Sequence, residues 1–508
     1  MTMVQGSSAH RRAGEQLAAP ACSDPGHAER SRPPASEWGA VVGRWGRVLG
    51  GCLRGRAWPL AMTVASVVGA MGWSLLAVVH SDGLVMWRVP GDIWGTLRGA
   101  HVVAWGDIGG VYRAGTGLVS FPGTAVLLVP VALVSSALGL TESFPYPLPH
   151  PTAWLVLGPY EVVLASVALF AVDALARRLA VPAGRRAWLS VTGAIVLFPV
   201  DALWGHPEDA VAVGLLLYGL RAGLDGRLVS AGWLAGAAVA VQPLVLLGLP
   251  VVAAVIGWRR LPGLAVRTAL PAAAVLAVCL VGAEHATVHA LLDQPNFPRI
   301  DRVTPWTALA PRLGGRGRSL AVAAGPGRLV ALAGAVAVGA GLWRCRWATV
   351  VGARHRSRWV RAGSAASPMV VPSPTADAAA GPILGMGGSA VVWALAVALS
   401  LRCLTESVMD PYYLWPPLGV GLLAAATASG RAGGKRFAVA GAAAVATTVL
   451  AELHLVWWVW WYGVTFGMLV TVACGFPDRV GRWRSSSVPR MPLAQQEREH
   501  CALGSSRG

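Results

Sequence analysis

The chain has 508 residues, of which 55% are hydrophobic and only 13% are charged, and its mean hydropathy is +0.56. Because charged residues make up about 25% of an average soluble domain, this composition excludes a soluble globular protein and indicates an integral membrane protein. The net charge of +18 does not indicate nucleic-acid binding, since no basic patch with interleaved aromatic residues occurs. The seven cysteines form neither a disulfide framework nor a metal-binding spacing.

The first part of the chain, residues 1–57, is rich in Ser, Pro, Ala, Gly and Arg and lacks hydrophobic periodicity. This composition predicts a disordered, basic cytoplasmic tail. Residues 477–508 are predicted to form a second such tail. Between the tails we identify thirteen apolar segments, near 59–80, 121–140, 153–176, 187–204, 209–222, 228–242, 243–258, 264–284, 327–343, 386–402, 412–428, 436–453 and 456–475. The block 228–258 forms either two short helices or one long one, since a membrane span needs about 20 residues.

Two basic tails on the same side of a membrane require an even number of crossings. If segment 121–140 crossed, five basic loops would lie outside the cell. We therefore expect it to be a juxtamembrane or re-entrant helix, in which Pro122 and Pro130 favour a bend. The prediction is an all-α, polytopic bundle with about twelve crossings, covering residues 58–476. Its long connections are expected at 81–152 (first external loop, with juxtamembrane helices), 285–326 (external) and 344–385 (flexible and cytoplasmic).

On this topology, the polar interruptions of the apolar segments all fall on the outer face. They are Asp92, Asp107, residues 205–209, Gln242 with Pro243, residues 293–302, Glu406 with Asp410, and Glu452 with His454. Ionisable residues beside membrane segments are costly to desolvate and typical of functional sites. Their gathering on one face predicts a binding or reaction site there.

Several motifs in these outer-face segments carry a resemblance to known enzymes. They are Asp92, Trp105-Gly106-Asp107, Val111-Tyr112, Phe121-Pro122, Val129-Pro130, Gly205-His206, Ala231-Gly232 to Gln242-Pro243, and the run from Asp410 to Tyr413 followed by Leu-Trp-Pro. In their order and spacing they resemble the GT-C glycosyltransferases, in particular the actinobacterial polyprenol-phosphate-mannose-dependent mannosyltransferases of glycosyltransferase family 87. The resemblance covers roughly residues 59–475. Three positions depart from the family pattern, since Gly123 replaces a proline, His206 a glutamine and Gln242 a lysine.

The resemblance implies transfer of a sugar, in this family mannose, from a polyprenyl phosphate donor to a lipid or cell-envelope glycan. The reaction would be a single inverting displacement at the outer face of the cell membrane. It requires a base for the acceptor hydroxyl and cationic or hydrogen-bonding groups for the departing phosphate. Asp92 matches the family's catalytic aspartate and is the expected base, with Asp82 and Asp107 as competitors. An N-cap is the structural alternative for Asp92.

The remaining polar residues of the outer face are expected to bind substrate. They are Asp107, Tyr112, His206, Glu208, Asp209, Gln242, Arg302, Trp306, Glu406, Asp410, Tyr412 and Tyr413. Arg302 suits a phosphate and Trp306 a sugar face. Helix capping and an interfacial aromatic belt are the structural alternatives. No metal site is expected, because the spacing of His206, Glu208 and Asp209 is not diagnostic even though these groups suit a divalent cation.

Two other functions remain open from the sequence. A transporter or lipid flippase should carry ionisable residues near the midplane and inverted repeats, whereas the acids here cluster at segment ends and the two halves do not look alike. The second is an inactive scaffold derived from the same fold, which the departures at Gly123 and Gln242 keep open.

Overall fold

The computed structural model describes the second of two units into which the chain divides, Met1–Arg54 and Gly55–Gly508. The described residues are 56–80, 91–113, 116, 118, 120–140, 153–292, 295–296, 302–310, 312–313, 320–322, 326–363 and 387–477. Both expected tails therefore lie outside the described residues, apart from the residues at their inner ends.

The described chain is almost wholly helical, which confirms the predicted all-α class. Its longer helices are α2 (Ala57–His80), α3 (Gly91–Ala104), α4 (Pro122–Ala137), α5 (Trp154–Ala165), α6 (Val167–Arg178), α7 (Ala183–Ala202), α8 (Pro207–Leu224), α9 (Leu228–Val241), α10 (Leu249–Ile256), α11 (Leu261–Leu292), α12 (Pro326–Gly363), α13 (Gly388–Thr405), α14 (Trp415–Ala426), α15 (Gly430–Glu452) and α16 (Trp457–Cys474). Short 3-10 helices are η1 (Ile108–Gly110), η2 (Pro243–Gly248), η3 (Trp258–Arg260), η4 (Thr307–Leu309) and η6 (Pro411–Leu414).

Five short strands occur in the described connections. They are β1 (Pro295–Asn296), β2 (Arg302–Val303), β3 (Arg312–Leu313), β4 (Leu320–Val322) and β5 (Val408–Met409). They form two small antiparallel sheets, in the orders β1-β4-β3 and β2-β5. The second sheet joins the connection between α11 and α12 to the segment that follows α13.

Within the described residues, five helical segments are long and apolar enough to cross a membrane. They are Val156–Arg178, Leu261–Leu292, Pro326–Cys345, Gly388–Thr405 and Trp457–Cys474. Their outward surfaces are apolar as well, and Val281 of α11 is 91% exposed. Large exposed apolar surfaces are rare on soluble monomers, so lipid is the solvent that these helices require.

The block 228–258 forms α9, then η2 and α10, which is the predicted alternative of two short helices and not one long helix. Helix boundaries differ from the predicted segments elsewhere. Segment 153–176 is divided into α5 and α6 at Ser166. Helix α11 continues past residue 284, through a non-helical Ala283, to Leu292. Helix α12 continues past residue 343 into the segment expected to be a flexible loop, because Arg and Ala favour helix even where the sequence is no longer apolar. Residues 364–385 of that segment lie outside the described residues.

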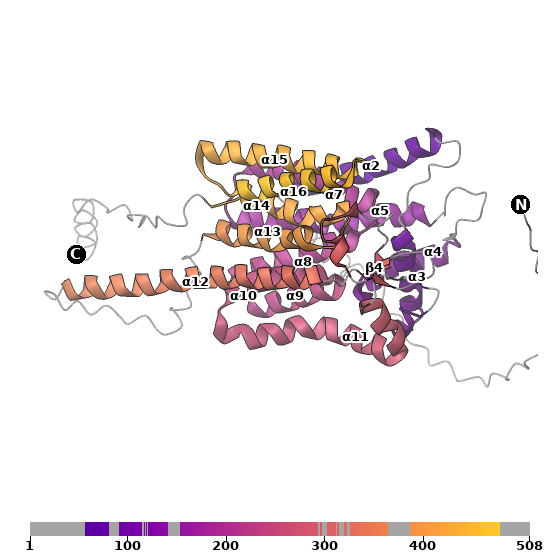
Figure 1. The fold of residues 1–508 in the computed structure, drawn as a ribbon, viewed down its shortest axis with the longest axis horizontal. Coiled ribbons are helices and arrows are strands. Elements are labelled where there is room, and N and C mark those ends of the chain that lie inside the picture. The colour runs from indigo at the N-terminus through magenta and orange to yellow at the C-terminus, as the bar shows by residue number, and fades with distance from the viewer. Residues whose placement is uncertain are drawn as a thin grey trace, which may run out of the picture. The chain divides into compact units, whose positions relative to one another are not determined.

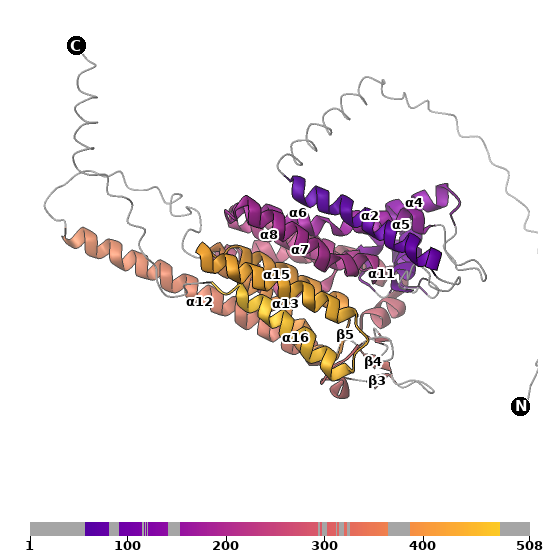
Figure 2. The same ribbon diagram turned by 90° about the horizontal axis from the view of Figure 1, so that it is seen from above.

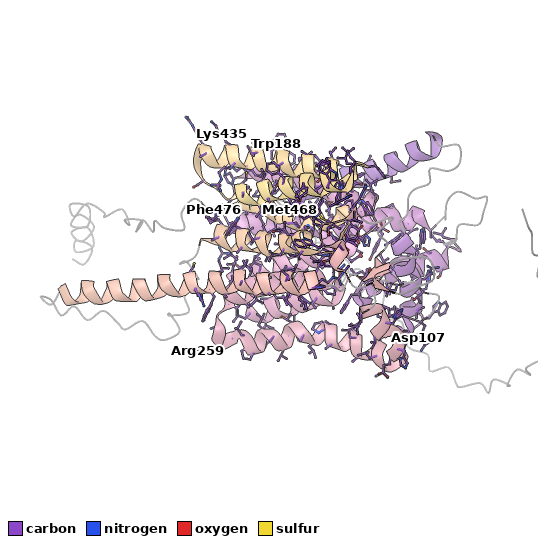
Figure 3. All side chains as sticks on the ribbon, viewed as in Figure 1. Asp107, Trp188, Arg259, Lys435, Met468 and Phe476 are labelled. Atoms are coloured by element: carbon purple, nitrogen blue, oxygen red, sulfur yellow. The ribbon has the colours of Figure 1, made fainter. Side chains whose placement is uncertain are left out.

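The helices of the second unit form a bundle with two chemically different ends. Figure 1 shows α3, α4 and β4 at one end, and α12 extending past the other. The same extension of α12 is visible from above in Figure 2. Lys435 and Arg259 lie at the end opposite Asp107 (Figure 3). Arginines hold the ends of neighbouring helices together there: Arg178 binds Asp225 across α6 and α8.

Candidate functional site

A cavity of about 380 Å³ lies at the end of the bundle that carries α3 and α4. One part of its wall is apolar and consists of Phe121, Pro243, Leu244, Leu246, Leu247, Ala290, Leu291, Leu329, Ala331 and Leu332. The other part is polar and consists of Tyr112, Ser120, His206, Gln242, Arg328, Arg402, Glu406, Tyr412 and Tyr413. Such a wall suits a ligand with a long apolar part and a charged head.

The cationic part of the wall is built by α12 and α13. Nε of Arg328 lies 2.9 Å from the buried Glu406 carboxylate, and Nε of Arg402 lies 3.7 Å from the same group. The Arg402 guanidinium also lies 3.5 Å from the ring centroid of Tyr413. The two guanidinium groups share the Glu406 carboxylate, and Arg402 also interacts electrostatically with the buried Asp209.

Close packing of α12 on α13 brings these charges together. Gly327 lies so near the carbonyl oxygen of Thr405 that a side chain on it would overlap that oxygen. The hydroxyl of Thr405 donates a hydrogen bond of 2.8 Å to the carbonyl of Gly327. The glycine therefore allows the contact that sets Arg328 beside Glu406.

A second polar part of the wall, next to the arginines, is formed where α8 begins. Gly205 has a positive φ of 63°, and Pro207 occupies the first helical turn. The turn leaves His206 and Glu208 buried, with Nδ1 of the imidazole 2.8 Å from Oε1 of the carboxylate. The hydroxyl of Ser120 donates to the same oxygen at 3.2 Å. Tyr412 stacks on the imidazole, with ring centroids 3.9 Å apart and planes at 19°.

Two of the departures from the family pattern have packing or hydrogen-bond partners. Gln242 follows the last residue of α9 and has an extended backbone conformation. Its side-chain amide donates a hydrogen bond of 2.6 Å to the Asp209 carboxylate. Gly123 packs directly on the carbonyl oxygen of Ala240, where a side chain would overlap that oxygen. Both contacts join segments far apart in the sequence, so neither position is a defect in the fold.

Tyr112 reaches the cavity from the connection between α3 and α4. Its hydroxyl donates a 2.9 Å hydrogen bond to the carbonyl of Ser120. Desolvation by burial raises the pKa of the phenol, and the nearby Cys279 raises it further. Tyr112 therefore stays neutral and acts as a hydrogen-bond donor that orders the Ser120 segment.

The structure thus brings most of the expected substrate-binding residues to one place. Tyr112, His206, Gln242, Glu406, Tyr412 and Tyr413 line the cavity. Glu208 and Asp209 lie directly behind it, hydrogen-bonded to lining residues. Asp410 is buried immediately before η6, which carries both tyrosines.

Besides Glu208, Asp209 and Asp410, three more expected ligands do not line the cavity. Asp107 is paired with Arg113 at 2.6 Å on an exposed surface. Arg302 lies over the ring of Trp460, 5.5 Å from its centroid. The indole nitrogen of Trp306 donates to the carbonyl of Leu404 at 2.7 Å. Each of these side chains has a partner in the structure, and its predicted role as a ligand stays a prediction.

The expected base, Asp92, lies in the first turn of α3. Its side chain is outside the described residues. The competitor Asp82 is outside them too.

Several polar residues of the site were not expected from the sequence. Arg402 stands four residues before the expected Glu406, a spacing that pairs side chains on a helix and is readable from the sequence. Arg328 carries no such signal, because its partner is 78 residues away. Glu161 and Asp201, which interrupt segments expected to be apolar, are both buried, and each lies near enough to Glu208 for their negative charges to repel one another.

In the part of the chain that the structure describes, no group of three or more His, Cys, Asp or Glu side chains is placed to hold a metal ion. No protein-family model matches the chain, and no curated protein matches it either.

Proposed function

We propose that this chain is a membrane glycosyltransferase that transfers a sugar from a polyprenyl phosphate to a lipid or cell-envelope glycan. The observation that carries the proposal is the two-part wall of the cavity, with arginines on one part and leucines on another. A polyprenyl phosphate sugar has a long apolar chain, a charged phosphate and a polar sugar. The cavity offers a complementary surface for each.

Arg402 and Arg328 are the proposed phosphate ligands. Guanidinium groups bind phosphate by charge-assisted hydrogen bonds, and both of these arginines line the cavity. They supply the cation that is lost where Gln242 stands in place of the family's lysine. As the bond between sugar and phosphate breaks, the same charges would stabilise the leaving phosphate.

Mannose, the inverting displacement and the outer-face location come from the resemblance. The charge distribution supports the location, since Arg259 and Lys435 lie at the end of the bundle away from Asp107 (Figure 3). With that end in the cytoplasm, both tails would be cytoplasmic and the cavity would face outward. Helix α4 lies at the cavity end with α3 (Figure 1), which supports a non-crossing segment 121–140 and the proposed twelve crossings.

The test is transfer of a labelled sugar from polyprenyl phosphate to lipid by membranes that contain the chain. We expect transfer by the wild type, and a loss in Asp92→Asn if Asp92 is the base that the resemblance implies. Equal transfer by these two proteins would remove Asp92 from that role. Absence of transfer by the wild type from any polyprenyl phosphate sugar would refute the function itself.

A transporter or flippase is the second candidate, and one observation favours it. Both carboxylate oxygens of the buried Glu161 lack a hydrogen-bond partner among the described residues. Uncompensated acids inside membrane proteins are typical of ion and substrate pathways. A flippase would move the labelled donor across a bilayer and leave its sugar attached, so the same labelled donor distinguishes the two functions.

A further inference from the structure

A second and much smaller cavity lies where α2 meets α5, α6 and α7. Its volume is about 10 Å³, just enough for one water molecule or one monatomic ion. The polar part of its wall consists of Thr63, Ser66, Ser166 and Asp201, and the rest is apolar. Helix α2 packs against both α5 and α7 (Figure 2), so separate segments of the chain form this wall.

Two hydroxyl groups of the small cavity already donate their hydrogens to the backbone. Thr63 donates to the carbonyl of Pro59 at 2.9 Å, and Ser166 donates to that of Val163 at 2.6 Å. A hydroxyl group has one hydrogen and two lone pairs, so neither side chain can also donate to the Asp201 carboxylate. What they offer to an occupant of the cavity is a lone pair. Such a wall suits an occupant that carries positive charge.

Asp201 is the ionisable residue of the small cavity, and its charged neighbours include three acids. Its side chain is only 4% exposed, and its Oδ1 atom is buried without a hydrogen-bond partner among the described residues. The carboxylates of Glu161, Glu208 and Asp209 act on it electrostatically, and all of them are negative. A buried charge in a protein is paired, bound to a metal ion or neutralised by a proton.

A monovalent metal cation satisfies both the hydroxyl oxygens and the carboxylate. Hard cations bind oxygen ligands, and one carboxylate balances one positive charge. Mg²⁺ keeps several water molecules when it binds, for which a cavity of about 10 Å³ has no room. A proton on Asp201 would need only one acceptor, whereas the wall provides three hydroxyl oxygens. A water molecule would bring no positive charge to the buried acids.

We infer that the small cavity is a binding site for a monovalent metal cation of the size of Na⁺, with the Asp201 carboxylate and the three hydroxyl oxygens as ligands. The inference goes beyond the proposed function and does not depend on it. The carbonyl of Asp201 accepts a 3.2 Å hydrogen bond from the N–H of Gly205, which belongs to the turn before α8. The bound cation therefore lies next to the segment that supports the wall of the large cavity, and it offsets the repulsion among the buried acids there.

The test measures Na⁺ binding to the purified full chain in lipid nanodiscs, without any substrate. A ligand that binds only the folded protein raises its thermal stability. Na⁺ should therefore raise the Tm by about 2 °C or more relative to choline at the same ionic strength. Choline is the reference because its quaternary ammonium group is too large for the cavity. Equilibrium binding of radioactive sodium gives the Kd.

Two variants locate the bound ion. Asp201→Asn keeps the size of the side chain and removes its charge, so the Kd for Na⁺ should rise by about 10-fold or more. Ser66→Ala removes one hydroxyl ligand, and its Kd should rise by about 3-fold or more. Ser190→Ala is the matched control, because Ser190 is buried on α7 and donates to the carbonyl of Arg186 without lining the cavity. Its Kd should equal that of the wild type.

The outcomes are distinct, and an unfolding curve in choline shows for each variant that it is folded. Weaker Na⁺ binding by the folded cavity variants, with unchanged binding by Ser190→Ala, supports the site. A wild type that binds no sodium and has the same Tm in Na⁺ and in choline overturns the inference and leaves the cavity to water or to a protonated Asp201. Equal Na⁺ binding by Ser66→Ala, Ser190→Ala and the wild type also overturns it, because the ion then lies elsewhere. Sugar transfer is not measured, so either negative result leaves the proposed function intact.

Discussion

Replacing Arg402 by glutamine tests the proposed phosphate site. A hydrogen bond to a charged group contributes about 1.5–3 kcal/mol, and about 1.4 kcal/mol corresponds to a tenfold change in affinity. The Kd for polyprenyl phosphate should therefore rise about 10- to 150-fold. Binding should not vanish, because Arg328 remains at the cavity wall, 2.9 Å from Glu406.

The assay is equilibrium binding of labelled polyprenyl phosphate to the purified chain in lipid nanodiscs. Arg178→Gln is the matched control, since Arg178 also pairs with a carboxylate, that of Asp225, but belongs to helix ends away from the cavity. Its Kd should equal that of the wild type. Unchanged affinity in Arg402→Gln, or a large loss in Arg302→Gln alone, would refute the phosphate site and favour the external loop that carries Arg302.

Three further variants test the packing. Gly123→Ala should lower stability by about 1–3 kcal/mol, as overpacking does, because the new methyl group meets the Ala240 carbonyl; Gly72→Ala, in open space, is its control, and equal thermal unfolding curves would contradict the contact. Asp173→Asn should cost about 3–5 kcal/mol, measured by thermal unfolding in detergent, since Asp173 is buried and pairs with two arginines. Glu161→Gln should leave stability unchanged or raise it, because it removes an ionisable group without a hydrogen-bond partner among the described residues; a clear loss of stability would contradict this reading.

The sequence predicted the helical class and most apolar segments because hydrophobicity and helix length are local properties. It also predicted that His206, Gln242 and Tyr412 belong together, since all three follow or precede apolar segments on one expected face. The break at Ser166 and the extension of α11 to Leu292 were not predictable in the same way. The break at Ser166 depends on packing between helices. The extension of α11 depends on helix-forming residues that follow its apolar run.

The position of Arg328 in the cationic part of the cavity wall could not be predicted from the sequence. Arg328 follows a connection between two helices and resembles an ordinary charged flank, and only the contact of Gly327 with Thr405 reveals its partner Glu406. Conversely, Arg302 and Trp306 have side chains suited to a sugar phosphate, yet each is engaged elsewhere. Residue type indicated the chemistry, whereas only the tertiary contacts show which of these residues line the cavity.

The central claim is that the cavity transfers a sugar from a lipid phosphate. The most direct measurement follows a doubly labelled donor, with one label on the sugar and one on the polyprenyl phosphate, in vesicles that contain the purified chain and a lipid acceptor extract. The account predicts that the labels separate, the sugar label moving to the acceptor, and that Arg402→Gln slows this separation. Labels that stay together while the intact donor crosses the bilayer would contradict the account and identify a flippase.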